Sequence, residues 1–243
     1  MDKGSLHMYK IGLVGGMGPV STVDYYQKII GGFQRKMPHA CPPIVIDSLD
    51  VFSLLNLEEN GRKAELTAQL AASITNLKNA GADFAVLTAN TPHLVFPELK
   101  KCASLPLLSI LDPVQRAITS KRQHTVGLLG TKITMETDFY AQKMASADIR
   151  VITPNSEQIE LIHKIITNEL ELGVVTPTSK QKVLTIINAM QNKYQLEGLI
   201  LGCTELPLML SQKDVSLTLY DTVELHVRAI LETALNEQFP AFQ

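Results

Sequence analysis

Cys203 lies where a thiol could transfer a proton. It follows the apolar run 199–202 and precedes Thr204 and Glu205, so it stands between an expected strand and an expected helix. Backbone N–H groups at a helix start favour negative charge, and this predicts a lowered pKa for the thiol. Two interpretations stay open, because a free cysteine is also often buried as a small hydrophobe.

Three further loops share this position between an apolar run and a helical pattern. They span residues 15–19, 89–93 and 130–134. Their backbone N–H groups, their threonine hydroxyls and the Asn90 amide would suit a small carboxylate. His93 either bonds a backbone carbonyl or joins the site. Loop 15–19 lacks the G-x-G-x-x-G pattern, so we predict a tight turn there and no dinucleotide site.

A weak internal repeat relates these loops in pairs. Gly12 and Gly127, Asp24 and Asp138, and Ala89 and Cys203 are 115, 114 and 114 residues apart, each pair within a similar local pattern. The counterpart of Cys203 is therefore Ala89, whose methyl group cannot exchange a proton. We expect two similar halves whose equivalent loops face each other.

Short apolar runs alternate with longer amphipathic ones, which predicts an α/β fold with parallel sheets covered on both faces. The expected strands span residues 10–14, 44–49, 84–88, 107–110, 125–129, 149–152, 198–201 and 216–219. The expected helices span residues 21–36, 62–80, 92–102, 113–120, 135–147, 157–172, 179–194, 206–211 and 223–236. In such a fold the loops that follow the strands gather at one edge, where ligands bind.

The repeat also predicts the domain organisation. Residues 8–110 together with 219–243 form the first half, residues 111–218 form the second, and the last helix packs back on the first half. The first seven residues have no apolar periodicity and are typical of an expression remnant before Met8.

Composition excludes several functional classes. The 243 residues are 45% hydrophobic and 19% charged, with a net charge of −2 and no basic run, so neither nucleic acid nor an anionic membrane is an expected partner. No apolar stretch reaches the roughly 18 residues of a membrane-spanning helix. Three cysteines without close pairing predict no disulfide framework, no zinc site and a reducing, cytoplasmic location.

The motifs in these loops resemble those of the aspartate/glutamate racemase family, in the same order and over nearly the whole chain. The motifs are Gly15-Gly16-Met17-Gly18-Pro19, Asn90-Thr91-Pro92-His93, Gly130-Thr131 with Thr134, and Gly202-Cys203-Thr204-Glu205. The resemblance implies two Rossmann-like halves related by pseudo-twofold symmetry, with an active site in the cleft between them. It also implies a homodimer that needs no pyridoxal phosphate, metal or nucleotide.

On this resemblance the chain is a cofactor-independent amino-acid racemase of the aspartate/glutamate type. Such an enzyme removes the α-proton and returns one from the opposite face, with a thiol on each side. Cys203 would be one acid–base group. The implied substrate-binding residues are Met17, Gly18, Asn90, Thr91, Thr131, Thr134 and Thr204.

The chain departs from the family pattern at Ala89, where the first cysteine is expected. Thr88, Thr91, His93 or a water held by them would have to supply the second proton. The cations that the family uses for a distal carboxylate are missing too, which leaves Lys132 or Arg62 as substitutes. Two alternatives therefore remain: a single-cysteine lyase of the decarboxylase type, and a small-carboxylate binder with impaired catalysis.

Overall fold

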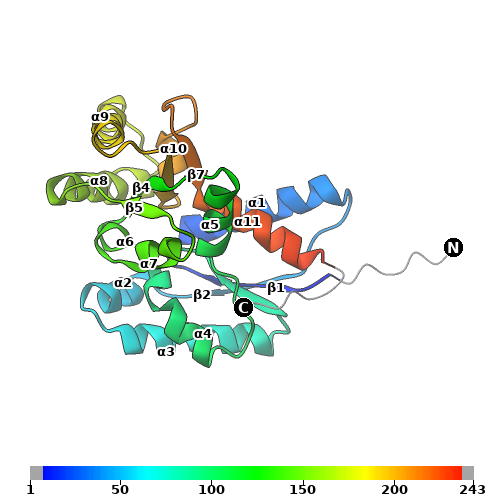
Figure 1. Cartoon of the computed structure of the whole chain (residues 1–243). Helices are drawn as coiled ribbons and strands as arrows, with labels where there is room; N and C mark the ends of the chain where they lie inside the picture. The colour runs from blue at the N-terminus through cyan, green and yellow to red at the C-terminus, as the bar shows by residue number, and fades with distance from the viewer. Residues whose placement is uncertain (1–7, 237–243) are drawn as a thin grey trace. The chain divides into compact units, whose positions relative to one another are not determined.

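The computed structural model describes residues 8–236, in which strands and helices alternate along the chain (Figure 1). The expected remnant at residues 1–7 lies outside the described residues. The described chain divides into two compact units. The first unit holds residues 8–88, 95–109 and 226–236, and the second holds residues 89–94 and 110–225.

The first unit is built on a parallel sheet with strand order β2-β1-β3. β1 (Ile11–Gly15) is central, flanked by β2 (Ile44–Ser48) and β3 (Phe84–Leu87). Every residue of β1 and β3 is buried, as expected for strands covered on both faces. The helices that belong to this unit are α1 (Pro19–Lys36), α2 (Val51–Glu59), α3 (Lys63–Asn79) and α4 (Phe96–Cys102).

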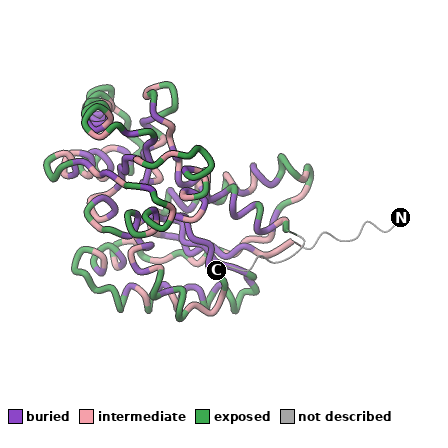
Figure 2. Tube along the Cα trace, viewed as in Figure 1, coloured by how far each residue is buried: buried purple, intermediate pink, exposed green. Residues whose placement is uncertain are grey.

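The second unit has a parallel sheet with strand order β5-β4-β6-β7. Its strands are β4 (Thr125–Gly130), β5 (Arg150–Ile152), β6 (Gly198–Gly202) and β7 (Thr218–Asp221). Its helices are α5 (Leu111–Ser120), α6 (Lys132–Glu136), α7 (Phe139–Ala145), α8 (Ser156–Asn168), α9 (Pro177–Tyr194) and α10 (Leu206–Met209), with a short 3-10 helix η2 (Leu170–Leu172). In Figure 2 these helices alternate between buried and exposed segments, as amphipathic helices on a sheet do.

The two sheets have equivalent topologies, which confirms the predicted α/β class. β1 and β4 are central, and β2 and β5 are the edge strands that follow them in sequence. A parallel bridge between Ala85 and Leu107 extends the first sheet beside β3, where β7 lies beside β6 in the second. The order of strands is thus repeated as well as the motifs.

The division between the units differs from the expected one in three places, residues 89–94, residue 110 and residues 219–225, all of which belong to the second unit. Residues 219–225 belong to the second unit, because β7 pairs with β6. Residues 89–94 also belong to the second unit, although they follow β3 of the first. They form the start of the 3-10 helix η1 (Thr91–Val95).

The last helix, α11 (Thr222–Ala234), begins in the second unit and is part of the first unit from His226 onward. There the His226 Nδ1 atom lies 3.0 Å from the Tyr25 hydroxyl, and its Nε2 donates to the Leu108 carbonyl at 3.2 Å. Leu231 packs where Gly32 of α1 has no side chain.

Several predicted elements differ from the observed ones, among them helix 157–172, which divides into α8 and η2, and one observed helix was not predicted. Strand 107–110 is only the bridge at Leu107, and helix 92–102 divides into η1 and α4. Helix 135–147 divides at Thr137, whose backbone is extended, into α6 and α7. Helix α2 was not predicted; its Asp50 cap accepts a hydrogen bond from the Phe52 N–H.

The glycine loop after β1 forms the predicted tight turn. Gly16 and Gly18 have φ values of 83° and 116°, a region that favours glycine. A Cβ atom at Gly16 would collide with the Leu49 backbone. Pro19 then begins α1, where its missing N–H costs nothing.

Candidate functional site

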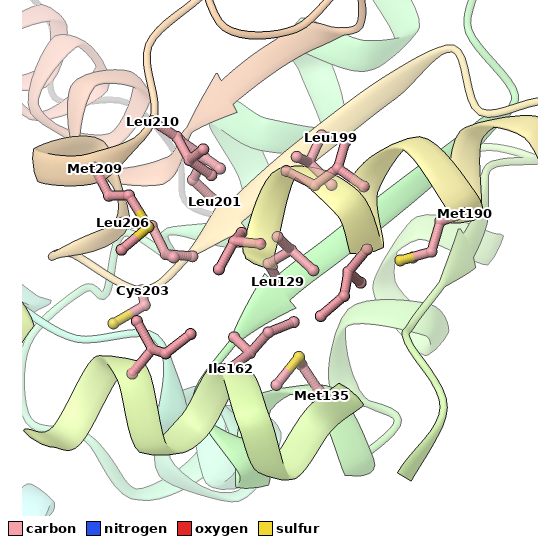
Figure 3. Close-up of a cluster of buried hydrophobic side chains, with 14 of the residues drawn as sticks. Leu129, Met135, Ile162, Met190, Leu199, Leu201, Cys203, Leu206, Met209 and Leu210 are labelled. Atoms are coloured by element: carbon pink, nitrogen blue, oxygen red, sulfur yellow. The ribbon is translucent and has the colours of Figure 1, made fainter. Parts of the chain in front are cut away.

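Cys203 follows β6 directly and is 6% exposed, whereas Cys41 and Cys102 are both exposed. Its side chain belongs to a cluster of buried apolar residues that includes Leu206 and Met209 of α10. Figure 3 shows Cys203 at the margin of this cluster, on the side of Leu206 and Met209. The position at the end of a strand is as predicted, but the helix that follows has only four residues.

The thiol of Cys203 is bonded to a carboxylate. Its Sγ donates to Glu205 Oε2 at 3.0 Å, and the Thr204 hydroxyl donates to the same oxygen at 2.5 Å. Burial and the negative charge of Glu205 raise the pKa of Cys203 well above its usual range, against a smaller lowering effect of the Glu205 backbone N–H. The predicted lowering of this pKa is therefore wrong, because burial and then the neighbouring carboxylate outweigh the backbone N–H at the helix start. Cys203 is a protonated thiol at rest.

A second carboxylate affects the same sulfur. Glu171 lies in η2, next to Leu170, which is buried in the same apolar cluster as Cys203. Its charge contributes to the raised pKa of Cys203. The pKa of Glu171 is itself raised, by partial burial and then by the charge of Glu205. The surroundings of the thiol are thus acidic.

Three threonine hydroxyls form a closed cluster in the second unit. The Oγ1 atom of Thr91 lies 3.2 Å from those of Thr131 and Thr134, which lie 3.1 Å from each other. Thr131 also caps α6, where it accepts a hydrogen bond from the Thr134 N–H. A hydroxyl donates one hydrogen bond and accepts two, so this cluster can rotate its protons toward an anionic ligand.

Asn90 is held in a buried network of its own. Its Oδ1 accepts a hydrogen bond from the Tyr140 hydroxyl at 2.5 Å, and its Nδ2 donates to Thr222 Oγ1 at 3.2 Å. Thr222 in turn donates to the carbonyl of Leu201, two residues before Cys203. Burial raises the pKa of Tyr140 far above its usual value, so its proton stays on the hydroxyl. The network fixes the loop after β3 relative to the end of β6.

His93 is buried with both ring nitrogens engaged. Nδ1 donates to the Ala89 carbonyl at 3.1 Å, and Nε2 accepts from the Ile110 N–H at 3.1 Å. Burial is the main reason that its pKa falls to about 4, so the ring is neutral near pH 7. Of the two interpretations offered by the sequence, the carbonyl bond is the one observed. This geometry ties the loop after β3 to the start of α5.

The remaining predicted residues lie in the first unit. Thr88 is fully buried and donates to the Val14 carbonyl at 3.1 Å, and its hydroxyl lies 3.2 Å from that of Thr22. The Gly16 N–H donates to the same Thr22 hydroxyl at 2.9 Å. These bonds support the glycine turn that carries Met17 and Gly18.

The cations proposed for a distal carboxylate are already paired. Lys132 forms an ion pair with Glu160, and each shifts the pKa of the other toward the charged form. Arg62 is paired with Glu65 in the same way on the surface of the first unit. Neither arrangement presents an unmatched positive charge to a ligand.

Residues 8–236 contain neither a further cluster of metal-binding side chains nor a membrane-spanning helix. Within that range no three His, Cys, Asp or Glu side chains are grouped so that they could hold a metal ion. Over the same residues no helix is both long and apolar enough to cross a bilayer.

Comparison with known proteins identifies the family of this chain. The family model described as Asp/Glu/hydantoin racemase matches residues 14–230. The chain belongs to this family. A broad specificity amino-acid racemase of Bacillus subtilis, RacX, is 24% identical to it over 94% of the chain and 99% of the relative.

Solved structures from the same family share the fold. A candidate Asp/Glu racemase from Yersinia pestis is 32% identical, covers 94% of this chain and all of its own, and superposes with a TM-score of 0.87. An aspartate racemase homologue from Pyrococcus horikoshii is 36% identical, covers 93% and 99% of the two chains, and has a TM-score of 0.78. These relatives support an isomerase of the racemase type.

Sequence reasoning missed three residues that shape the site. Glu205 stands two residues after Cys203 in the sequence, which allows the observed bond. Tyr140 lies in the repeated Asp-aromatic-Tyr pattern, which is a usable signal, but its partner Asn90 is 50 residues away. Glu171 belongs to none of the motifs quoted above.

Proposed function

We propose that this chain is a cofactor-independent amino-acid racemase in which Cys203 transfers the α-proton on one face of the substrate. The observation that carries the proposal is the Cys203 thiol held by Glu205 at 3.0 Å at the end of β6. Family membership supports this choice of reaction, since the relatives described above are named as amino-acid racemases or their homologues.

The chemistry follows from the state of the thiol. A base on the opposite face takes the α-proton and leaves a planar carbanion, and Cys203 S–H then donates its proton to that carbon and becomes a thiolate. In the reverse direction the thiolate removes the α-proton and becomes a thiol again. A thiol with a raised pKa gives a strongly basic thiolate, which suits the abstraction of a weakly acidic C–H proton. Glu205 orients the S–H bond between turnovers.

The hydroxyl cluster is the proposed site for the substrate carboxylate. Thr91, Thr131 and Thr134 can donate to its oxygens once their mutual bonds rearrange. Asn90 has two N–H groups, of which the bond to Thr222 uses one, so the other suits a substrate oxygen. Thr204, and the N–H groups of Met17 and Gly18, are the further donors that the family resemblance implies.

The opposite face lacks a thiol, because Ala89 cannot exchange a proton. Among Thr88, Thr91 and His93, the Thr91 hydroxyl or a water bound to it is the proposed second donor, since Thr91 already belongs to the hydroxyl cluster. His93 has both nitrogens engaged and Thr88 is fully buried. A hydroxyl is a weak acid near neutral pH, so we expect slow or one-sided racemisation.

The decisive experiment follows the α-hydrogen. The protein is incubated in D₂O with single enantiomers of a panel of amino acids, and both Cα deuteration and chirality are measured. We expect deuteration that disappears in Cys203→Ala and persists in the control Cys102→Ser, which changes an exposed thiol. Equal deuteration by wild type and Cys203→Ala would contradict the proposal.

A single-thiol lyase is the second candidate. The specific observation in its favour is a protonated thiol without a partner thiol at Ala89, since such a thiol can protonate one face of a carbanion left by decarboxylation. Release of carbon dioxide from substituted malonates would identify this activity, because a racemase releases none. Stabilisation by amino acids without deuteration or carbon dioxide would instead indicate a binder with impaired catalysis.

A homodimer in the cytoplasm completes the proposal, with a small amino acid as the partner. The reducing cytoplasm would keep Cys203 as a thiol. Light scattering after size-exclusion chromatography tests the dimer, and a monomer at micromolar concentration would overturn it.

A further inference from the structure

The sheet of the first unit has one open edge, at β2. In the part of the chain that the structure describes, β2 pairs with β1 on one side and with no strand on the other. The Pro43 carbonyl accepts a hydrogen bond from β1, and the Leu49 N–H donates one to it. Because backbone groups alternate along a strand, those of Ile44, Ile46 and Ser48 point away from β1. These three residues present their N–H and C=O groups to the open edge, where another strand could bind them.

The equivalent edge strand of the second unit is protected, whereas β2 is not. β5 has three residues and begins with the exposed Arg150. Short edge strands and charged side chains discourage pairing with another chain. β2 has five residues, and its one charged side chain, Asp47, accepts a hydrogen bond from Asn76 of α3 on one face of the sheet. On the other face the side chain of Ile46 is 41% exposed, so this edge has the features of a strand that a partner covers.

Exposed apolar side chains of α1 adjoin this edge. A Cβ atom at Gly15 would lie 2.6 Å from the Thr22 methyl group and 3.3 Å from a methyl group of Ile46, so these two side chains are neighbours on one face of the sheet. Tyr26 follows Thr22 by one helical turn and is 44% exposed, and Val23 is 55% exposed. The apolar surface of Ile46 therefore continues onto α1.

This flank of α1 is uncharged. Asp24, Lys28 and Arg35 lie about 160–200° around the helix from Tyr26, at about 100° per residue. Asp24 and Lys28 form an ion pair there. The residues within about 100° of Tyr26 on the side of Val23 are neutral, namely Val23, Gln27, Ile30 and Gln34. A second copy of the same flank can therefore approach without bringing like charges together.

The open edge is complementary to a second copy of itself. When two β2 strands pair antiparallel about a twofold axis at Ile46, each Ile46 faces the partner's Ile46, and Ile44 faces the partner's Ser48. All the outward N–H and C=O groups of the strand are then paired. The next pair in this register is Pro42 with the partner's Asp50. Pro42 has no N–H and Asp50 caps α2, so the ladder ends there in both copies.

The surface reaches the size of a specific interface. The 18 residues of α1 extend about 27 Å, and one helix layer with one sheet layer is about 20 Å deep, so two such faces bury about 1,000 Å². In the joined sheet β1 and its copy are three strand spacings apart, about 14 Å. Because α1 packs on β1 and helices in direct contact are about 8–10 Å apart, side chains as large as Tyr26 and Ile46 are needed between the two α1 helices.

We propose that the open edge of β2 and the adjoining flank of α1 form an interface between two copies of this chain. The two sheets join in the strand order β3-β1-β2-β2-β1-β3. Backbone hydrogen bonds between the β2 strands set the register, and Val23, Tyr26 and Ile46 of both copies form the apolar centre. This inference rests on the homodimer of the proposed function and names the surface that forms it.

Disulfide trapping tests the register. In a Cys41→Ser, Cys102→Ser background, Ile46→Cys places two thiols opposite each other, with Cα atoms about 5.5 Å apart, within reach of a disulfide. Ile44→Cys is the matched control, because its Cα atom is more than about 10 Å from its own copy in this register. With oxidised glutathione as the oxidant, we expect a covalent dimer on a non-reducing gel for Ile46→Cys and at most a trace for Ile44→Cys. No covalent dimer of Ile46→Cys, or equal linking of the two variants, overturns the proposal.

Light scattering after size-exclusion chromatography tests the surface. Ile46→Lys brings two like charges together at the axis, and we expect the Kd of the dimer to rise at least about 100-fold. Val175→Lys is the control, since Val175 is 42% exposed and belongs to the second unit, and it should keep the wild-type Kd. Circular dichroism shows whether each variant is folded.

The outcomes separate this surface from the homodimer and from the reaction. A wild-type dimer that persists with the same Kd in Ile46→Lys overturns the surface and leaves the homodimer standing. A wild-type monomer at micromolar concentration overturns both. The racemase reaction is tested independently by Cα deuteration.

Discussion

The loops after β3 and β6 occupy equivalent positions in two sheets of the same topology, but they have different contents. The loop at Ala89 is held by hydrogen bonds, with Asn90 and His93 both buried and bonded. The loop at Cys203 carries a thiol and a carboxylate in contact. The first loop thus supports structure, and the second is the one to which we assign proton chemistry. The two sheets share their topology, whereas these two loops differ in their side chains.

The largest effect on the difference between the two loops is expected from placing a thiol at position 89, in the loop after β3. Ala89→Cys gives the first loop an acid–base group, and general acid–base catalysis is worth about 10²–10⁴-fold in rate. We expect racemisation to rise by about 100-fold or more, measured by the appearance of the opposite enantiomer. Cys203→Ala in the same background should abolish the gain. An Ala89→Cys variant that folds and racemises no faster would show that position 89 does not reach the α-carbon.

The structural role of the first loop predicts a pH dependence of stability. Folded His93 binds a proton only near pH 4, whereas an unfolded histidine binds one near pH 6.5. Between these values the unfolded chain binds more protons, so the free energy of unfolding falls as the pH is lowered from 6.5 to 4 and is unaffected above 6.5. The contribution at stake is about 3 kcal/mol.

Urea denaturation across this pH window tests the histidine. His93→Gln should lose that part of the pH dependence, together with stability at pH 7 from the bonds it breaks. The exposed His124 supplies the control variant, His124→Gln, which should keep it. A wild-type protein as stable at pH 4.5 as at pH 7 would show that His93 is protonated without cost.

A smaller effect is expected from removing the charge of Glu205, which tests what raises the pKa of Cys203 in the second loop. Glu205→Gln removes the charge that helps to hold the pKa of Cys203 high, so that pKa should fall. Thiolate absorbance near 240 nm, followed against pH in a Cys41→Ser, Cys102→Ser background, reports it. Each unit of the fall raises the thiolate fraction about tenfold at a pH below the pKa. A Cys203 pKa that stays the same in this variant would leave burial and the charge of Glu171 as its causes.

The smallest expected effect concerns the bond that holds Asn90. Tyr140→Phe removes the hydroxyl that donates to Asn90 Oδ1 and leaves a buried acceptor without that donor. We expect a loss of about 1–3 kcal/mol in the free energy of unfolding, from thermal or urea denaturation. Tyr26→Phe changes a partly exposed tyrosine at the equivalent place in the repeat and should cost less. Equal losses of unfolding free energy in the two variants would show that the hydrogen bond to Asn90 adds no stability beyond that of an exposed tyrosine hydroxyl.

Most strands and helices, and the loops that follow the strands, could be predicted from the periodicity of apolar residues. Buried parallel strands appear in the sequence as apolar runs, and the loops that follow them contain Thr91, Thr131 and Thr134. The sequence predicted these three threonines as parts of one binding site, and their hydroxyls lie within hydrogen-bond distance of one another. The expected helix 21–36 matches α1 except for its first two residues. The helix α2 was missed because its nine residues bury only Leu54 and Leu57, too few to show a period.

Features that depend on side-chain placement were out of reach. The raised pKa of Cys203 depends on its burial and then on the rotamer that turns Glu205 toward the sulfur. The assignment of residues 89–94 to the second unit depends on bonds to Tyr140, Thr222 and Ile110, all distant in sequence. Propensity and periodicity carry no information about such pairs.

The burial of Cys203 has a practical consequence for the chemical labelling of this protein. Electrophilic dyes and peroxide react with thiolates that solvent can reach, and Cys203 is 6% exposed and protonated whereas Cys41 and Cys102 are exposed. Fluorophores or surface tethers can therefore be attached through Cys41 and Cys102 while the third sulfur is left unmodified. For the same reason, brief exposure to an oxidant should modify Cys41 and Cys102 before Cys203.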